Sequence, residues 1–230
     1  PVADFVAAVA ATGYDGYLSL EIFNDQFRGG APKAIAADGH RSLVYLGDQV
    51  RRKPESASLT VPSMPDRAAV AGVSFIEFSV GKADAEPLIV MLHSLGFRRT
   101  AKHKTKNVSV YQQGNVRILI NREEIGFAST AYAVHGASAY AMAIQVEDAT
   151  AAMARAVALG AEPFSQPVGP GELDVPAIRG VGGALIYLVD AKSSLGRIWE
   201  IDFQSAEDDA APQSAALLAV DHVAQTVAYE

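Results

Sequence analysis

The chain has 230 residues, of which 50% are hydrophobic, enough for a packed core and too many for a disordered protein. Lys and Arg total 19 against 26 Asp and Glu, and the net charge of −7 argues against binding to nucleic-acid phosphates or to an anionic membrane. The absence of cysteine excludes disulfides, thiolate catalysis and zinc fingers, so a metal site must use His, Asp, Glu, Asn or Gln.

Two features of the sequence bear on the cellular location of the protein. No apolar run approaches the roughly 20 residues that span a bilayer, and the apolar start Pro1–Ala11 lacks the basic residues of a signal peptide. We therefore expect a cytoplasmic protein.

The chain opens at Pro1 without Met, inside a helix-like pattern, and closes at Glu230 just after a strand-like run begins. We expect it to be an internal piece of a longer protein.

Residues 1–52 predict a helix, a strand and a second helix. Residues 1–12 are rich in Ala and Val behind an initial proline, and Gly13 suits the position after the last turn. Tyr17–Phe23 is a run of strand formers, and residues 32–52 are again helix-like. A buried strand between two helices is one unit of an α/β fold.

A pattern of strand, helix and three strands then occurs twice in residues 72–204, behind a Pro- and Ser-rich linker at 53–71. In the first copy we predict strands at Val73–Val80, Phe97–Lys104, Val108–Gln113 and Val116–Asn121, with a helix at Ala85–Leu95. In the second copy we predict strands at Tyr140–Val146, near Glu162, at Ala184–Val189 and at Arg197–Phe203, with a helix from the N-cap Asp148 to Leu159. Such a repeat predicts an α+β fold, a paired module with a curved sheet and helices on its outer face.

A second linker follows the paired module. Residues 205–216 are acidic and rich in Ala, Ser, Pro and Gln. Leu217–Val227 then alternates in strand fashion and resembles Val73–Val80. We predict that residues 217–230 hold the first strand of a further βαβββ module.

The first segment carries a motif, GYDGYLSLE at Gly13–Glu21, that resembles the end of the sugar-phosphate isomerase-like TIM barrels. In that family a Gly-Tyr-x-Gly turn leads into the last barrel strand, which ends in a glutamate ligand of a divalent metal. The resemblance implies that Glu21 is a ligand of Mg, Mn or Co. From the residues alone, a solvated carboxylate at a strand end is the favoured interpretation of Glu21. A single glutamate cannot hold a metal by itself.

The second segment resembles the N-terminal half of the 4-hydroxyphenylpyruvate dioxygenases, which are tandem vicinal-oxygen-chelate proteins. The resemblance rests on Phe127–Gly136, ending in His-Gly, and on the strand and Val-x-Asp-Ala motif of Tyr140–Ala149. It implies that this half has a structural role, while the following half binds Fe(II) with two His and one Glu. The first His of that family stands in an Asp-His-Val strand opening, which here makes His222 the candidate iron ligand.

The internal repeat tests whether the complete module could hold the same metal. Aligning Val220–Val227 with Val73–Val80 puts Phe75 where His222 stands, and the second His position falls near Ala141. Only Glu200 keeps a carboxylate, and Phe and Ala bind no metal. We predict that residues 72–204 hold no metal at this position, and that Glu200 is a paired or solvated side chain.

The remaining histidines and aromatic residues have simple structural interpretations. We expect His93 at a helix end, His135 in a turn and His103 on a solvated basic strand among lysines. We expect Phe75, Phe78, Trp199 and Phe203 to be core aromatics.

Taken together, the two resemblances match one architecture, that of the bacterial two-domain 3-dehydroshikimate dehydratases of quinate and shikimate catabolism. That family implies conversion of 3-dehydroshikimate to protocatechuate at a barrel metal, with Glu21 as one ligand, a small-molecule substrate and a homo-oligomer. The general base cannot be identified in this sequence. Two alternatives stay open: an Fe(II)-dependent 4-hydroxyphenylpyruvate dioxygenase-like oxygenase with His222 as first ligand, and a catalytically silent docking or oligomerisation module.

Overall fold

The computed structural model describes residues 1–25, 29–54, 60, 64–206 and 215–226. The chain divides into two compact units, the first built mainly from Pro1–Asp66 and the second from Arg67–Ala154 and Ala161–Val227. Within the described ranges, no helix combines the length and apolar character needed to span a bilayer.

The first unit contains the two predicted helices, α1 (Val2–Ala11) and α2 (Pro32–Arg51). Pro32 lies at the start of α2, where its missing N–H costs no hydrogen bond. The strand predicted at Tyr17–Phe23 is not formed, and this prediction is wrong for the present chain. Tyr17 is 99% exposed, and the described part of the first unit contains no strand that could pair with this segment.

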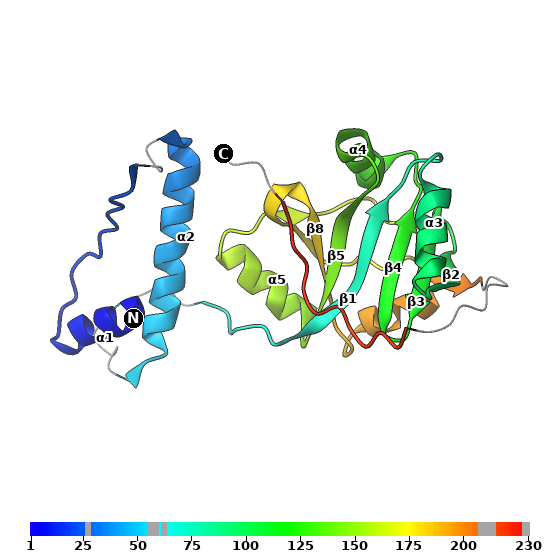
Figure 1. The fold of residues 1–230 in the computed structure, drawn as a ribbon. Coiled ribbons are helices and arrows are strands. Elements are labelled where there is room, and N and C mark those ends of the chain that lie inside the picture. Colours follow the sequence, from blue (N-terminus) through cyan, green and yellow to red (C-terminus); the bar gives the residue numbers. More distant parts are fainter. Residues whose placement is uncertain (26–28, 55–59, 61–63, 207–214, 227–230) are drawn as a thin grey trace. The chain divides into compact units, whose positions relative to one another are not determined.

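The second unit is a nine-stranded sheet in the order β6-β7-β8-β5-β1-β4-β3-β2-β9 (Figure 1). Its strands are β1 (Val70–Ser79), β2 (Arg98–His103), β3 (Val108–Gln113), β4 (Val116–Asn121), β5 (Ser138–Val146), β6 (Pro163–Phe164), β7 (Ala177–Arg179), β8 (Leu185–Val189) and β9 (Phe203–Ser205). Its helical segments are α3 (Ala85–Ser94), α4 (Gly126–His135), α5 (Ala149–Ala158), η3 (Val181–Gly183), η4 (Ser194–Arg197) and α6 (Ile198–Ile201).

The strand pairing shows the predicted repeat directly. β1 pairs in parallel with β4, and β5 pairs in parallel with β8, so each copy closes its βαβββ unit in the same way. The two copies join through the antiparallel pair of β1 and β5. The predicted N-cap is confirmed, because the Asp148 carboxylate accepts a hydrogen bond of 2.8 Å from the backbone N–H of Ala151.

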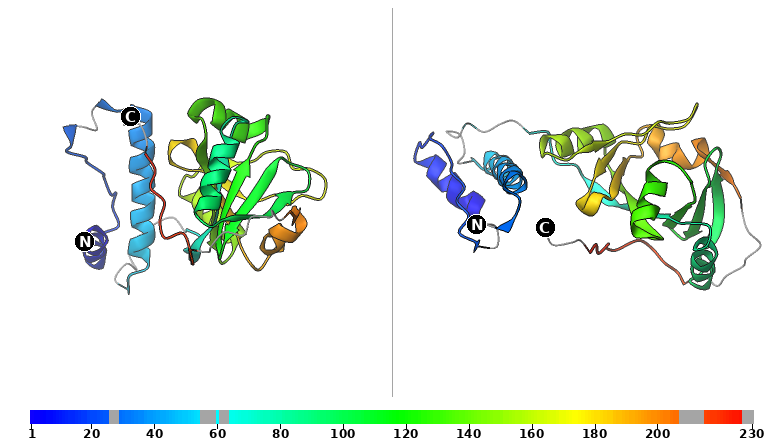
Figure 2. Two further views of the ribbon diagram at one scale, coloured as in Figure 1. Left: turned by 45° about the vertical axis from the view of Figure 1, so that its right-hand side comes forward. Right: turned by 90° about the horizontal axis from the view of Figure 1, so that it is seen from above.

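Alternation along the strands sends successive side chains to opposite faces of the sheet. On one face, Ile118 and Ile120 of β4 pack with Leu92 of α3, and Leu188 of β8 packs with Ala152 of α5. Figures 1 and 2 show α3 against this outer face. The opposite face carries a separate core cluster that contains Phe75 and Phe203, with the partly buried Tyr187 and Trp199 packed against it. The predicted α+β module with outer helices is therefore confirmed.

One helix was not predicted from the sequence. α4 contains Thr130, Tyr132 and Val134, which are weak helix formers, and no side chain caps its start. It forms because Ala128 and Ala131 pack against the sheet side chains Tyr140 and Leu185. Tertiary packing outweighs local propensity here.

The end of the second copy also differs from the prediction. The strand predicted at Arg197–Phe203 is wrong, because Ser194–Ile201 is helical and only Phe203 belongs to a strand. The Ser193 hydroxyl accepts a hydrogen bond from the backbone N–H of Leu195 and so starts the helical turn. The third strand of this copy is instead β7, which lies between the strands predicted near Glu162 and at Ala184–Val189. β9 instead pairs with β2 and extends the sheet of the first copy.

The strand predicted at Leu217–Val227 is likewise not formed in 217–226, and Val227 lies outside the described residues. This segment is attached to the second unit by Gln113, whose side-chain oxygen accepts hydrogen bonds from Ala215 N (2.9 Å) and Leu217 N (3.4 Å). No strand within the described ranges pairs with it. The interpretation of residues 217–230 as the start of a further module stays a prediction.

Candidate functional site

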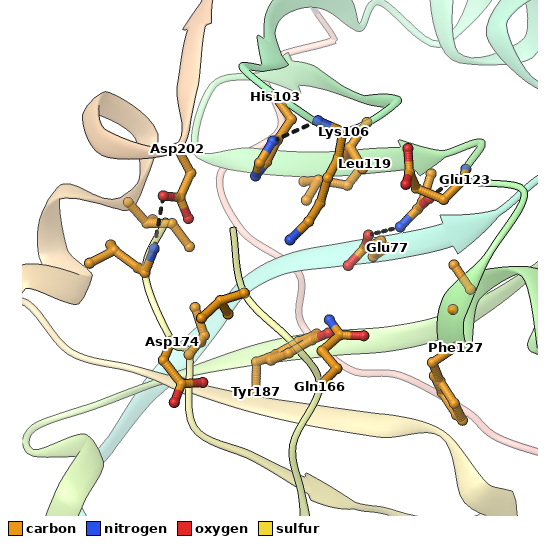
Figure 3. Close-up of a pocket in the computed structure, with 18 of the residues that line it drawn as sticks. Glu77, His103, Lys106, Leu119, Glu123, Phe127, Gln166, Asp174, Tyr187 and Asp202 are labelled. Carbon is orange, nitrogen blue, oxygen red and sulfur yellow. Dashed lines mark hydrogen bonds between the residues drawn. The ribbon is translucent and has the colours of Figure 1, made fainter. Parts of the chain in front are cut away.

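The second unit contains a cavity of about 600 Å³ on the face of the sheet that carries the aromatic cluster (Figure 3). Its lining comes from both copies of the repeat, from the start of α4 and from the loop before β7. The lining side chains include Phe75, Glu77, His103, Lys106, Asn121, Glu123, Phe127, Tyr140, Phe164, Gln166, Asp174, Tyr187, Trp199, Asp202 and Phe203. A volume between about 300 and 1,000 Å³ is usual for small-molecule sites.

Aromatic rings form much of the wall. Trp199 stands edge-on to Phe75 with 5.8 Å between ring centroids, and lies 5.3 Å from Phe203. On another side, the rings of Phe127 and Phe164 are 5.1 Å apart. The prediction that Phe75, Phe78, Trp199 and Phe203 are core aromatics is confirmed, and Phe75, Trp199 and Phe203 also border the cavity. Such walls favour a flat, apolar ring as the occupant.

A buried polar cluster lies in the middle of the sheet. The Asn121 amide donates to Glu77 Oε1 at 2.9 Å and to the Tyr140 hydroxyl oxygen at 3.0 Å. Burial raises the pKa of Glu77, although hydrogen bonds from Asn121 and Tyr140 act in the opposite direction. Burial also raises the pKa of Tyr140 well above its usual value. Burial therefore favours the protonated form of Glu77, whose side chain borders the cavity.

His103 does not occupy the solvated position expected for it. It is 9% exposed, and its ring stands edge-on to Phe203 at a centroid distance of 5.0 Å. Its Nδ1 accepts hydrogen bonds from the backbone N–H groups of Thr105 (3.2 Å) and Lys106 (3.1 Å). Burial lowers its pKa, and the positive charge of Lys106 lowers it further. Because Nδ1 is an acceptor, Nε2 carries the proton of the neutral ring.

Lys106 follows His103 in the loop between β2 and β3 and extends into the cavity (Figure 3). Its ammonium forms an ion pair of 2.8 Å with Glu172. Burial favours the protonated form of Glu172, but hydrogen bonds from Lys106, Thr105 and Gly169 outweigh it and lower its pKa to about 2. The pair connects the β2–β3 loop to the loop before β7.

The two metal ligands proposed from the sequence lie outside this cavity. Glu21 is an exposed side chain of the first unit. His222, in the second unit, is 81% exposed and its Nδ1 lies 2.9 Å from the carboxylate of Asp221. Within the described ranges, no group of three or more His, Asp or Glu is arranged to hold a metal ion.

The positions that the repeat aligns with a metal site have packing or surface roles. Phe75 and Ala141 are buried among apolar side chains. Glu200 is exposed and paired with Arg197 at 2.9 Å, which confirms the interpretation of Glu200 as a paired carboxylate. Sequence reasoning missed Glu77, Lys106, Tyr140 and the burial of His103. The signal available for Glu77 was its place among the apolar residues of the predicted strand Val73–Val80.

The sequence is similar to those of two groups of known proteins. The chain is 40% identical over 228 residues to the 3-dehydroshikimate dehydratase of Pseudomonas putida, covering 97% of this chain and 36% of that protein. It is 38% identical over 158 residues to a 4-hydroxyphenylpyruvate dioxygenase of a Pseudomonas species, covering 68% of this chain and 43% of that one. The chain thus spans little more than a third of the dehydratase.

A solved structure confirms the predicted architecture. It is described as a xylose isomerase-like TIM barrel/4-hydroxyphenylpyruvate dioxygenase fusion protein, and it matches 96% of this chain at 40% identity with a TM-score of 0.81, over 35% of its own length. The resemblance to a barrel–dioxygenase fusion is therefore borne out. Residues 65–204 match the family model described as hydroxyphenylpyruvate dioxygenase, HPPD, N-terminal. The chain belongs to this family of dioxygenase-like N-terminal modules.

Proposed function

We propose that this chain is part of a metal-dependent 3-dehydroshikimate dehydratase that forms protocatechuate. The observation that carries the proposal is the extent of the similarity. The dehydratase of Pseudomonas putida matches 97% of the chain and so includes the first unit, whereas the dioxygenase of the Pseudomonas species matches 68%. A relative that shares both units is the better guide to the activity of the whole protein.

The proposed metal chemistry involves Glu21. Its exposed carboxylate fits a hard divalent cation such as Mg²⁺, Mn²⁺ or Co²⁺, but it supplies one ligand only, and the described residues contain no complete set. The other ligands belong, in this proposal, to barrel strands outside this sequence. When bound, the metal supplies Lewis-acid stabilisation of negative charge on a substrate oxygen. This chain's own contribution, in this proposal, is the exposed carboxylate of Glu21.

His222 is the second proposed ligand, for Fe(II) in a following dioxygenase-like half. The carboxylate of Asp221 faces its Nδ1 at 2.9 Å, which leaves Nε2 exposed to solvent. A carboxylate on one imidazole nitrogen is a common arrangement for a metal-binding histidine. We further propose a cytoplasmic homo-oligomer acting on a small molecule.

The test is an activity assay on the purified full-length protein, which includes the barrel strands outside this sequence, after removal of bound metal. We expect 3-dehydroshikimate to be converted to protocatechuate when Mg²⁺, Mn²⁺ or Co²⁺ is restored, and Glu21→Gln to abolish the conversion. Asp15→Asn, in the variable position of the same turn motif, is the matched control and should keep activity. Oxygen uptake with Fe²⁺ and 4-hydroxyphenylpyruvate, in the absence of dehydratase activity, would favour the oxygenase and overturn the proposal.

A further inference from the structure

We propose that a pocket at the start of β1 and β4 binds a small hydrophilic monocarboxylate, with Arg117 as the partner of its carboxylate group. The pocket has a volume of about 320 Å³ and shares no lining residue with the aromatic cavity described above. It is lined by residues 71–74 of β1, by Asn115 and Arg117, and by Gln145 of β5. The inference does not rest on the proposed dehydratase activity, which involves Glu21 of the first unit.

The pocket exists because β1 and β4 separate from each other at this end of the sheet. β1 pairs with β4 only from Ile76 to Ser79, so residues 71–74 have no partner among the described strands on the β4 side. On the other side, the register of β1 with β5 shifts twice between Val70 and Phe75. Bulges bend a strand and increase its local twist. The gap between β1 and β4 is therefore a consequence of the strand pairing.

Gly72 leaves the backbone of β1 open toward this gap. Its φ of 143° lies in the region that favours glycine, and no atom outside its chain neighbours lies within 4 Å of the place where a Cβ would stand. A glycine inside a strand commonly marks a bulge or a position where a ligand approaches the backbone closely. Since Gly72 also lines the pocket, a bound molecule can reach the main chain of β1 there.

Arg117 is a partly buried cation without an acidic partner. Its guanidinium carbon lies 4.9 Å from the centre of the Trp199 ring, and burial lowers its pKa. Among the described residues, no carboxylate pairs with the Arg117 side chain and no oxygen accepts a hydrogen bond from it. The face of an aromatic ring stabilises the positive charge but offers no oxygen to the five N–H donors. Because a buried charge is costly unless it is paired, a bound anion would supply the missing partner.

The charge of the pocket matches an anion with one negative charge. Of the described residues that line it, only Arg117 is charged. A planar guanidinium presents two parallel N–H groups, which match the two oxygens of a carboxylate. A doubly charged phosphate group would leave one charge unopposed, because the lining contains no second cation. The aromatic cavity differs in this respect, since Lys106 already pairs with Glu172 there and several acidic side chains line the same space.

Neutral polar side chains make up much of the remaining lining. Ser74 contributes a hydroxyl, and Asn115 and Gln145 contribute amides, so each can donate and accept hydrogen bonds. None of these three side chains forms a hydrogen bond with another described residue. Ligand hydroxyl groups can pair with them, whereas an apolar ligand would leave them unpaired. The volume lies at the lower end of the range of roughly 300–1,000 Å³ for small-molecule sites, so the ligand must be small.

Isothermal titration calorimetry on the purified full-length protein at low salt measures binding, with D-gluconate as the probe. D-sorbitol has a hydroxymethyl group in place of the carboxylate of gluconate, and hexanoate keeps the carboxylate but has no hydroxyl group. We expect saturable binding of gluconate, with sorbitol weaker by at least about tenfold and hexanoate weaker by about threefold or more. Inorganic phosphate, which carries more charge than one guanidinium opposes, should bind more weakly than gluconate.

Substitutions in the pocket separate the contributions of charge, shape and hydroxyl recognition. Arg117→Gln removes the charge and should weaken gluconate by about tenfold or more. Arg117→Lys keeps the charge but loses the planar fork, so its affinity should be intermediate. Ser74→Ala should weaken gluconate but leave hexanoate unchanged, because only gluconate has hydroxyl groups. Arg98→Gln, an exposed arginine of β2 outside the pocket, is the matched control and should bind gluconate like the parent protein.

Trp199 reports where gluconate binds, because its ring lies against the Arg117 guanidinium. Gluconate should change the fluorescence of the protein by an amount that Trp199→Phe removes. Glu21→Gln should retain the binding that depends on Arg117. Loss of dehydratase activity with intact gluconate binding, or the reverse, therefore tells the two proposals apart.

The proposal is overturned if gluconate does not bind or if Arg117→Gln binds it as the parent does. It is also overturned if phosphate binds through Arg117 more tightly than gluconate. Thermal melting shows whether each variant is folded, and gluconate should raise the melting temperature of the parent more than that of Arg117→Gln. An equal rise in both proteins would place the bound gluconate outside this pocket and contradict the proposal.

Discussion

Asn121 donates a hydrogen bond of 2.9 Å to Glu77 inside the sheet of the second unit. The two residues come from β4 and β1, parallel neighbours in which Glu77 is opposite Leu119 and Ser79 is opposite Asn121. The parallel closure of the first repeat therefore supplies the polar partner that a carboxyl group on a central strand requires. The hydrogen bond between Asn121 and Glu77 therefore stabilises the sheet, and the same two side chains line the cavity.

Replacing Asn121 by Leu should lower the free energy of unfolding by about 1–3 kcal/mol, because Glu77 then loses its buried donor. Urea unfolding measures this loss. The double variant Glu77→Leu with Asn121→Leu should cost less than the sum of the two single changes, since both polar partners are then removed together. Additive losses would show that the two side chains do not interact.

The raised pKa of Glu77 predicts how stability changes with pH. A carboxyl group whose pKa is higher in the folded than in the unfolded state contributes most below its ordinary value of 4.5, and this contribution is lost as the pH rises through the folded-state pKa. Glu77→Gln removes the titration. The stability of the parent protein should therefore fall relative to that of Glu77→Gln as the pH is raised from about 4 to about 8. A constant difference over that range would contradict the assignment.

The strands of the first repeat could be predicted because their signals are local. Val108–Gln113 and Val116–Asn121 were predicted with the bounds that the structure shows, since the turn at Gly114, with φ of 54°, separates two alternating runs. The strand at Tyr17–Phe23 has equally good strand formers but lacks a neighbour to pair with. Composition alone could not show that difference.

The cavity could not be predicted, because distant segments create it. The burial of His103 depends on Phe203, which follows it by about a hundred residues, and on the β2–β3 loop turning its N–H groups toward Nδ1. Periodicity tells which side chains share a face of a strand. It does not show that Phe203 follows a helical turn or that Tyr187 stands opposite His103.

The N-cap of α5 should contribute measurably to the stability of the second unit. Asp148→Ala should lower the free energy of unfolding by about 1 kcal/mol, because the backbone N–H of Ala151 loses its 2.8 Å acceptor. Asp148→Asn keeps an acceptor oxygen and is the matched control, with a much smaller expected loss. Equal losses for the two variants would show that the carboxylate charge, rather than the cap, stabilises the helix.

The Lys106–Glu172 pair predicts a loss of stability in acid. The pKa of Glu172 is about 2 in the folded protein against an ordinary 4.5, so its stabilising effect is present above pH 4.5 and disappears as the pH falls toward 2. Thermal melting at a series of pH values should therefore show Glu172→Gln less stable than the parent at neutral pH, with the difference shrinking in acid.

The matched control is Glu86→Gln on the exposed surface of α3, for which no hydrogen bond or ion pair occurs within the described residues. Its difference from the parent should not change with pH. If the difference shown by Glu172→Gln persists below pH 2, the ion pair with Lys106 is not its cause. The connection between the β2–β3 loop and the loop before β7 would then depend on neutral hydrogen bonds, such as that of Thr105 to Glu172.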